Sequence, residues 1–185
     1  GAVAGVVGGR LVVAGGYGDY GSLTSVEAYT PTGWTPLPPL PHAASQATAC
    51  VLNGRLYVMG GMACNKLQVL EKSEENGFSW TVKAQLPANR HDAASVVRDG
   101  KIWVIGGFGD GGLTDSVTIY DPEHDSWGTG PALPSAVSGG RAVTHDGDIH
   151  LISDIPHRVC RGAAWRAAEP GSLAKRSACE SVLLG

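Results

Sequence analysis

The sequence predicts an all-β protein in which short antiparallel strands recur in a repeated unit. Glycine accounts for 27 of the 185 residues and proline for 11, and each disfavours a helix by about 1 to 3 kcal/mol at an interior position. Double glycines recur about every 46 residues: Gly15-Gly16, Gly60-Gly61 and Gly106-Gly107. Tryptophans recur with the same period, at Trp34, Trp80 and Trp127. Each tryptophan is followed six residues later by a Leu-Pro pair. A fixed period of this length is typical of stacked structural repeats.

Composition and charge exclude several classes of protein. The formal net charge of -3 lacks the basic excess of a nucleic-acid-binding protein. No stretch approaches the roughly 20 consecutive apolar residues of a membrane span. The four cysteines are too few and too scattered for a disulfide framework or a zinc site: Cys50, Cys64, Cys160 and Cys179. We therefore expect reduced thiols, a cytoplasmic location, no cofactor, and no nucleic-acid or membrane partner.

The first two strands of each unit are predicted to form a hairpin. A turn glycine recurs with the common period: Gly9, Gly54, Gly100 and Gly147. The Asn or Asp that precedes the last three glycines favours the positive φ angles of a two-residue turn. The second strand, at residues 11–14, 56–59 and 102–105, is apolar throughout, which indicates burial on both faces. The double glycine that ends this strand allows two backbones to approach closely.

The third and fourth strands complete each predicted unit. Residues 26–29, 67–70 and 117–120 form the third strand. The fourth strand begins at each tryptophan and ends at the Leu-Pro, because proline lacks a backbone donor for the ladder. A four-stranded sheet cannot bury both of its faces alone, so neighbouring units must stack. Radial stacking of such units gives a β-propeller.

The double glycine, the spaced aromatic residue, the tryptophan and the Leu-Pro together resemble kelch repeats, most clearly over residues 99–134. The resemblance extends over about residues 1–154 and implies propeller blades, of which such propellers usually have six or so. The second unit departs from the motif, because Leu70 replaces the usual aromatic residue and an insert precedes Trp80. The predicted kelch blades and half blade are residues 1–41, 42–87, 88–134 and 135–155. Three and a half blades form an incomplete arc, which further blades or a second chain would complete.

Residues 156–185 are predicted to be a non-kelch tail. Every repeat marker is lost there, and the balance of charge changes from acidic to basic. Three interpretations remain open: an unrelated tail or aberrant reading-frame product, a shortened fourth blade whose last strand begins at Trp165, or a docking helix over residues 172–180.

Motifs for chemistry are weak in this sequence. Residues 16–21 match the Gly-x-Gly-x-x-Gly dinucleotide fingerprint, but a strand rather than a helix is predicted to follow. The same motif recurs at residues 107–112, so we interpret it as a repeat loop. His145 and His150 flank a hairpin turn, yet a metal site needs three or four converging ligands. Acidic loop residues lack the order of a calcium loop and are interpreted as turn formers: Asp19, Asp110 and Asp115.

The resemblance implies a partner-binding face. In substrate-binding kelch propellers this face comprises the residue after the double glycine and an arginine just past the Leu-Pro. The matching positions here are Tyr17, Met62, Phe108 and Arg90. The arginine occurs in one unit of three, because Ala44 and Val137 occupy the other two positions.

We therefore predict a protein-binding module without catalytic or metal-binding residues. The resemblance implies a role like that of the kelch substrate receptors of cullin ubiquitin ligases, or of actin-binding kelch scaffolds. The ligase receptors also carry a BTB domain, which is absent from these 185 residues. The alternative is a kelch-like propeller enzyme, either a sugar mutarotase or an oxidase similar to galactose oxidase.

Overall fold

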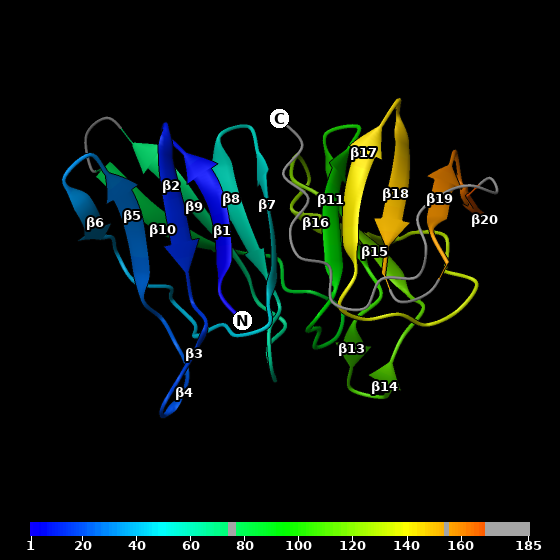
Figure 1. The fold of residues 1–185 in the computed structure, drawn as a ribbon, viewed down its shortest axis with the longest axis horizontal. Helices are drawn as coiled ribbons and strands as arrows, with labels where there is room; N and C mark the ends of the chain where they lie inside the picture. Colours follow the sequence, from blue (N-terminus) through cyan, green and yellow to red (C-terminus); the bar gives the residue numbers. More distant parts are fainter. Residues whose placement is uncertain (74–76, 154–155, 169–185) are drawn as a thin grey trace. The chain divides into compact units, whose positions relative to one another are not determined.

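A computed structural model describes residues 1–73, 77–153 and 156–168 of the chain. All regular secondary structure in these residues is β-strand, which confirms the all-β prediction. The strands form four antiparallel sheets of four strands and two short two-stranded hairpins (Figure 1). The chain divides into two compact units, Gly1–His91 and Asp92–Gly185. None of the described residues forms a helix with the length and hydropathy needed to cross a membrane.

The first unit contains two sheets and one hairpin. The strands of the first sheet, in their order across it, are β1 (Val3–Val7), β2 (Arg10–Ala14), β5 (Val26–Thr30) and β6 (Gly33–Pro36). The second sheet has the same order, with β7 (Thr48–Leu52), β8 (Arg55–Met59), β9 (Leu67–Ser73) and β10 (Gly77–Lys83). The hairpin between the second and third strands of the first sheet consists of β3 (Tyr17–Gly18) and β4 (Gly21–Ser22).

The second unit repeats this plan. Its third sheet contains β11 (Ala94–Arg98), β12 (Lys101–Ile105), β15 (Val117–Asp121) and β16 (Ser126–Thr129). The hairpin after the second strand is formed by β13 (Phe108–Gly109) and β14 (Gly112–Leu113). The fourth sheet contains β17 (Arg141–His145), β18 (Asp148–Ile152), β19 (Arg158–Arg161) and β20 (Ala164–Ala167). The four strands predicted for each repeat are thus present in all four sheets.

The fourth sheet corrects two predictions, the half blade at 135–155 and the non-kelch tail beginning at residue 156. Strands β19 and β20 add two antiparallel strands and extend the sheet to Ala167. Trp165 pairs across these strands with Cys160, as Trp127 pairs with Tyr120 in the third sheet. The interpretation as a fourth blade therefore holds up to Ala167. The predicted helix at 172–180 lies outside the described residues.

The turn residues take the conformations that their sequence predicts. Asn53 and Gly54 have φ angles of 51° and 71°, and Asp99 and Gly100 have φ angles of 52° and 71°. Two consecutive positive φ angles define the tight hairpin turn whose twist matches that of its flanking strands.

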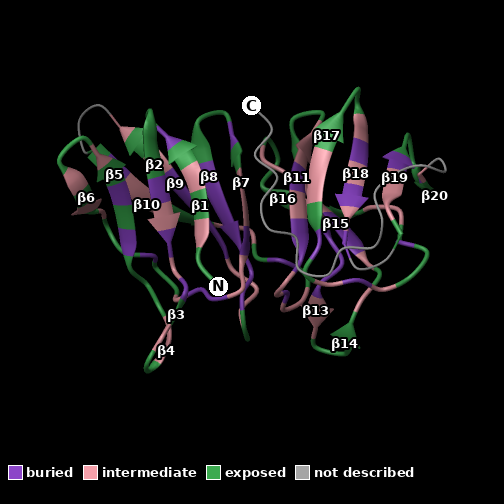
Figure 2. Ribbon diagram, viewed as in Figure 1, coloured by how far each residue is buried: buried purple, intermediate pink, exposed green. Residues whose placement is uncertain are grey.

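Each unit has a hydrophobic core between its two sheets (Figure 2). In the first unit, Val12 and Ala28 pack against residues of the second sheet that include Leu56 and Leu70. In the second unit the buried cluster includes Ile105, Val117, Ile149 and Trp165, from both sheets. Burial of these side chains contributes roughly 1.5 to 3 kcal/mol for each large one.

The prediction that the second strand is buried on both faces is confirmed for β8 and wrong for β2. Residues Leu56 to Met59 are all buried, whereas Leu11 is 42% exposed. Leu11 pairs with Val6, which is also exposed, and Tyr29 and Trp34 form an edge-on aromatic pair in the same sheet. An apolar run indicates burial only where another sheet covers the face, and no described residue covers this one.

The tryptophan marker has the same hydrogen bond in both units. The Trp80 indole N–H donates to the carbonyl of Pro38 at 2.8 Å, and the Trp165 indole N–H donates to the carbonyl of Pro131 at 2.9 Å. Each proline lies two residues before the leucine of the Leu-Pro that ends the preceding repeat. The indole therefore joins its own sheet to the preceding sheet and satisfies its single donor.

Candidate functional site

The residues of the predicted partner-binding face differ in exposure. Tyr17 and Met62, both in the first unit, are 68% and 48% exposed. Phe108 begins the corresponding hairpin of the second unit and is half-buried. Arg90 is only 6% exposed, and burial lowers the pKa of its guanidinium. Arg90 is therefore not among the exposed residues of the predicted face.

The loops that carry Tyr17 and Met62 are held by backbone hydrogen bonds. The Gly16 N–H donates to the Ala44 carbonyl at 2.7 Å, and the Ala44 N–H donates to the Leu23 carbonyl at 3.0 Å. The Met62 N–H donates to the Ser45 carbonyl at 2.9 Å. The chain at 44–45 therefore contacts both loops that follow a double glycine. These bonds fix the backbone of the loops, which reduces the backbone entropy lost on binding.

An open pocket of about 470 Å³ lies beside Met62. Its lining includes Ser22, Pro41, His42, Met62, Asn65 and Lys66. One wall is positioned by Gln68, which is fully buried in β9. The Gln68 side chain accepts a hydrogen bond from the His42 N–H at 2.7 Å and donates one to the His42 carbonyl at 3.0 Å. Our predictions missed this residue, although a single polar side chain in the apolar run 67–70 was its signal.

The two Gly-x-Gly-x-x-Gly motifs form hairpins. Residues 16–21 lead into β3 and β4, and residues 107–112 lead into β13 and β14. No helix follows either motif among the described residues, so a pyrophosphate would find no helix amino terminus there. This confirms the interpretation of both motifs as repeat loops.

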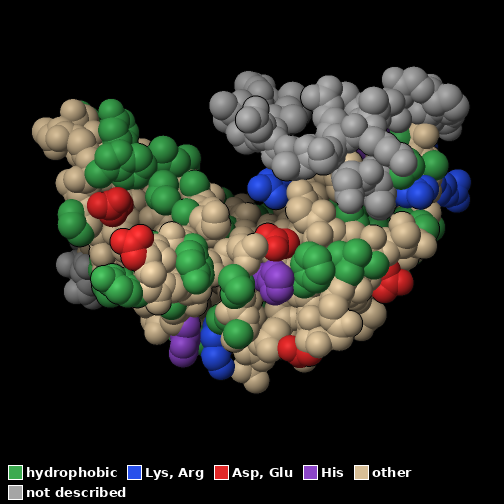
Figure 3. All heavy atoms as spheres, turned by 60° about the horizontal axis from the view of Figure 1, so that its bottom comes forward, with side chains coloured by type: hydrophobic (Ala, Val, Ile, Leu, Met, Phe, Trp, Pro, Cys, Tyr) green, Lys and Arg blue, Asp and Glu red, His purple; other side chains and the backbone are tan. Residues whose placement is uncertain are grey.

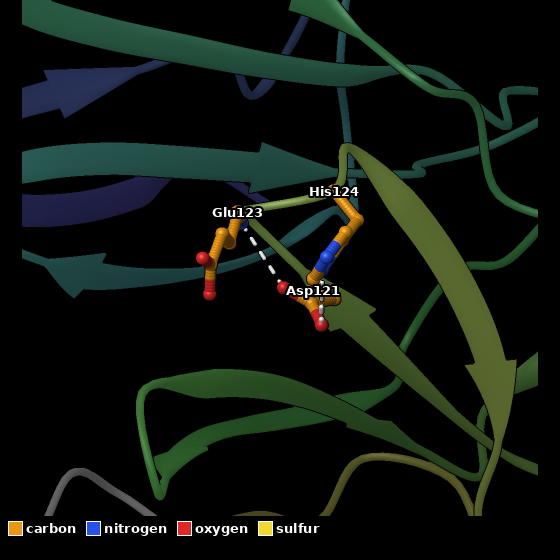
Figure 4. Close-up of side chains that lie close together, drawn as sticks. All are labelled: Asp121, Glu123 and His124. Atoms are coloured by element: carbon orange, nitrogen blue, oxygen red, sulfur yellow. Dashed lines mark hydrogen bonds and ion pairs between the residues drawn. The ribbon is translucent and has the colours of Figure 1, made fainter.

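Asp121, Glu123 and His124 form the one group of three potential metal ligands found among the described residues (Figure 4). The group lies at the turn between β15 and β16, and the Asp121 carboxylate already accepts hydrogen bonds from neighbouring residues. The Lys101 ammonium donates to Asp121 Oδ2 at 2.8 Å, and the Glu123 N–H donates to Asp121 Oδ1 at 3.0 Å. A cation at this carboxylate would face the Lys101 ammonium directly. The turn is therefore better suited to closing a hairpin than to binding a metal.

We predict that Asp121 makes this turn sensitive to acid. Its hydrogen bond from Lys101, followed by that from His124, lowers the pKa of the carboxyl group. Folding therefore favours the ionised form, and the stability it contributes is present above the unfolded pKa of about 4 and lost as the pH falls below it. Asp121→Asn is expected to be less stable than the wild type at neutral pH and equally stable at low pH, as measured by urea unfolding. Asp19→Asn, at an exposed position, is the control, and a difference that persists in acid would contradict the prediction.

The Cys50 and Cys160 thiols are not candidate nucleophiles. Burial raises the pKa of Cys50 to about 12 and also raises the pKa of Cys160. Because the thiolate is the reactive form, a raised pKa makes both thiols poor nucleophiles at neutral pH. The three cysteines within the described residues are free.

The histidines of the fourth sheet form a cluster that the sequence spacing did not reveal. The rings of His145 and His150 lie edge to face with centroids 5.9 Å apart. Pairing of β18 with β19 brings in His157, whose Nε2 lies 3.1 Å from His150 Nδ1. The structure thus adds a third histidine to the two that flank the hairpin turn.

The described residues visible in Figure 3 form no extended area of a single charge. Hydrophobic side chains are interspersed there with separate acidic, basic and histidine side chains. A mixed surface of this kind suits a protein partner better than a polyanion.

Comparison with known proteins agrees with the repeat structure. A family model described as "Kelch motif" matches residues 1–41 and 89–134. Kelch-like protein 35 of Mus musculus is 30% identical over 151 residues, which cover 78% of this chain and 25% of that protein. Kelch-like protein 35 of Homo sapiens is 39% identical over 154 residues, which cover 80% of this chain and 25% of that protein. The chain therefore spans about a quarter of the length of these relatives.

A solved structure has a similar fold. The structure titled "Structure of YjhT" matches with a TM-score of 0.77, over 91% of this chain and 70% of that chain, at 18% sequence identity. At this identity the likeness concerns the fold alone. Together with the four equivalent sheets and the recurring glycine and tryptophan markers, the match to the kelch motif and the similarity to the Kelch-like proteins show that the chain belongs to the kelch-repeat family.

Proposed function

We propose that this chain is a protein-interaction module. Its contact surface in the first unit is the loop end, which we define as Tyr17, Tyr20, Leu23 and Met62. Their exposed fractions are 68%, 104%, 38% and 48%. The observation that carries the proposal is this group of exposed tyrosine, leucine and methionine side chains on loops with a fixed backbone. Tyrosine is enriched among residues that dominate binding energy, and methionine adapts to irregular partner surfaces.

The pocket beside Met62 adds polar groups to the loop end. Lys66 donates to the Gln85 side chain at 3.0 Å, and Ser22 and Ser45 share a hydrogen bond of 2.7 Å. Apolar anchors surrounded by hydrogen-bonding groups are typical of protein interfaces. The similarity to the Kelch-like proteins also supports a role in protein interaction. That the whole protein has this role is part of the proposal.

The loop end makes a direct prediction. The double variant Tyr17→Ala/Tyr20→Ala is expected to weaken partner binding by about 30-fold or more, because truncating one binding hot spot costs about 2 kcal/mol. Partners would be identified by cross-linking and mass spectrometry with the wild-type chain, then purified and titrated against each variant.

The matched control is Glu123→Ala, at an exposed position in the β15–β16 turn of the other unit. It is expected to bind every partner like the wild type. If the double variant keeps the wild-type affinity for all purified partners while its melting temperature is unchanged, the loop end is not the contact surface.

A finer form of the proposal is that the module selects substrates for a cullin ubiquitin ligase. It is supported by the resemblance to kelch substrate receptors and by the matches to Kelch-like proteins. Such a receptor also needs a cullin-binding BTB domain, which these 185 residues do not contain. The test is the transcript that encodes the repeats. A reading frame joining a BTB domain to them supports the ligase role, and a reading frame without one favours another scaffold role.

A further inference from the structure

The two methionines of this chain differ in their access to solvent. Met59 is the last residue of β8 and is 0% exposed, whereas Met62 lies on the loop after this strand and is 48% exposed. Gly60 and Gly61 separate them, so the chain passes from a buried strand to the surface over the double glycine. A small reagent in solution therefore reaches the Met62 thioether and is kept from that of Met59.

The backbone around Met62 is held by hydrogen bonds that do not involve its side chain. The Met62 N–H donates to the Ser45 carbonyl at 2.9 Å, and the Cys64 N–H donates to the Gly61 carbonyl at 3.2 Å. The Met62 side chain lines the open pocket of about 470 Å³, so a small oxidant can approach it. None of the described residues donates a hydrogen bond to the Met62 sulfur, and its lone pairs are therefore available for reaction.

The thiols of the chain are the groups that compete with Met62 for an oxidant. Burial raises the pKa of Cys50 to about 12 and also raises the pKa of Cys160, and a thiol reacts as its thiolate. Cys64 is half-buried and lines the same pocket as Met62, which makes it the nearest competitor. A thioether has no proton to lose, so its oxidation does not slow when the pH falls. At about pH 5, where few thiols are ionised, a peroxide is therefore expected to oxidise Met62 before these three thiols.

We propose that Met62 is a site of reversible oxidation to methionine sulfoxide by a peroxide, and that this modification regulates the loop end. A lone pair of the Met62 sulfur attacks one oxygen of hydrogen peroxide, so that an S–O bond forms as the O–O bond breaks. The departing hydroxide takes the proton of the transferred hydroxyl group and leaves as water. The sulfur loses one electron pair and the peroxide gains it. Methionine sulfoxide reductases reverse this oxidation, with a dithiol as the reductant and water as the product.

The regulatory part of this proposal rests on the protein-interaction function proposed for the loop end. Met62 belongs to that surface together with Tyr17, Tyr20 and Leu23, which are also exposed. Oxidation converts its flexible apolar side chain into a polar one. A partner surface matched to the thioether has no donor in place for the sulfoxide oxygen, and burial of that oxygen without a donor is unfavourable. Oxidation therefore weakens binding and leaves the fold intact, because backbone atoms make the bonds that hold the loop.

The modification itself is tested on the 185-residue chain with hydrogen peroxide at about pH 5, without any partner. Trypsin cleaves after Arg55 and Lys66, so both methionines lie in one peptide, and its fragment ions locate the added oxygen by mass spectrometry. We expect Met62 to react at least about tenfold faster than Met59 in the folded chain, and at a similar rate in urea. A mixture of the reductases for both sulfoxide epimers is expected to remove the oxygen. Equal rates in the folded chain, faster oxidation of Cys64 than of Met62, or resistance to the reductases would each overturn the proposal.

The regulation is tested with the partners purified for the loop-end titrations. The oxidised wild type is expected to bind them about tenfold more weakly with an unchanged melting temperature, and the reductases are expected to restore the affinity. Met62→Leu, which has no thioether at this position, is the matched control and is expected to keep its affinity after peroxide treatment. Unchanged affinity of the oxidised wild type, or an equal loss in Met62→Leu, would overturn the regulation. If Tyr17→Ala/Tyr20→Ala weakens binding in that case, the protein-interaction function stands, and if it does not, that function fails as well.

Discussion

Replacement of Gly60 by alanine is expected to destabilise the first unit by about 3 to 5 kcal/mol. Gly60 has a φ of +68°, and a Cβ atom added there would overlap the backbone carbonyl oxygen of Arg90. That carbonyl accepts a hydrogen bond from the Gly61 N–H at 2.8 Å, so it cannot move away without losing the bond. The left-handed backbone, the steric overlap and the strained hydrogen bond act together. Urea unfolding followed by tryptophan fluorescence measures the change in the free energy of unfolding.

Gly54→Ala is the matched control for this prediction. Gly54 also has a positive φ, +71°, but a Cβ atom there would have no neighbour within 4 Å. Only the backbone strain of about 1 to 2 kcal/mol is then expected. If the two variants lost the same stability, close approach of the backbones would not be the reason for the double glycine.

Replacement of Gln68 by leucine is expected to cost about 2 to 4 kcal/mol. Leucine fills a similar volume, but it leaves both the His42 N–H and the His42 carbonyl without the partners they have in the wild type. The cost is mainly that of these unsatisfied backbone groups. Because His42 lines the pocket beside Met62, we also expect its amide to exchange hydrogen faster, by about 30-fold or more, in the variant. Urea unfolding and amide exchange measured by NMR test the two effects.

Gln85→Leu removes an exposed glutamine from the same unit. Its side chain contacts only Lys66 in the hydrogen bonds described above, and the expected change is within about 0.5 kcal/mol. Equal stability of Gln68→Leu and Gln85→Leu would show that the bonds to His42 do not stabilise the fold.

The surroundings of the predicted partner-binding residues could be inferred from the sequence only in part. Tyr17 and Met62, which directly follow a double glycine, are exposed. Arg90 follows the corresponding Leu-Pro but is buried, and sequence position gives no information about which neighbours cover a long side chain. Gln68 and the His150–His157 pair escaped prediction because each depends on a partner that only the folded chain brings close.

The sequence by itself determined the repeated strands, their hairpin turns and the breaks at the double glycines. These features depend on local chemistry: the φ angles open to glycine, asparagine and aspartate, and the spacing of apolar residues. The tertiary structure alone decided that Arg158–Ala167 completes a fourth sheet and that Leu11 is exposed. Cys160 and Trp165 pair across β19 and β20 although the repeat markers are missing there. Backbone hydrogen bonds between the strands and burial of both side chains in the core of the second unit are sufficient. Burial and the clustering of polar side chains depend on which surfaces meet, and that is set by contacts distant in the chain.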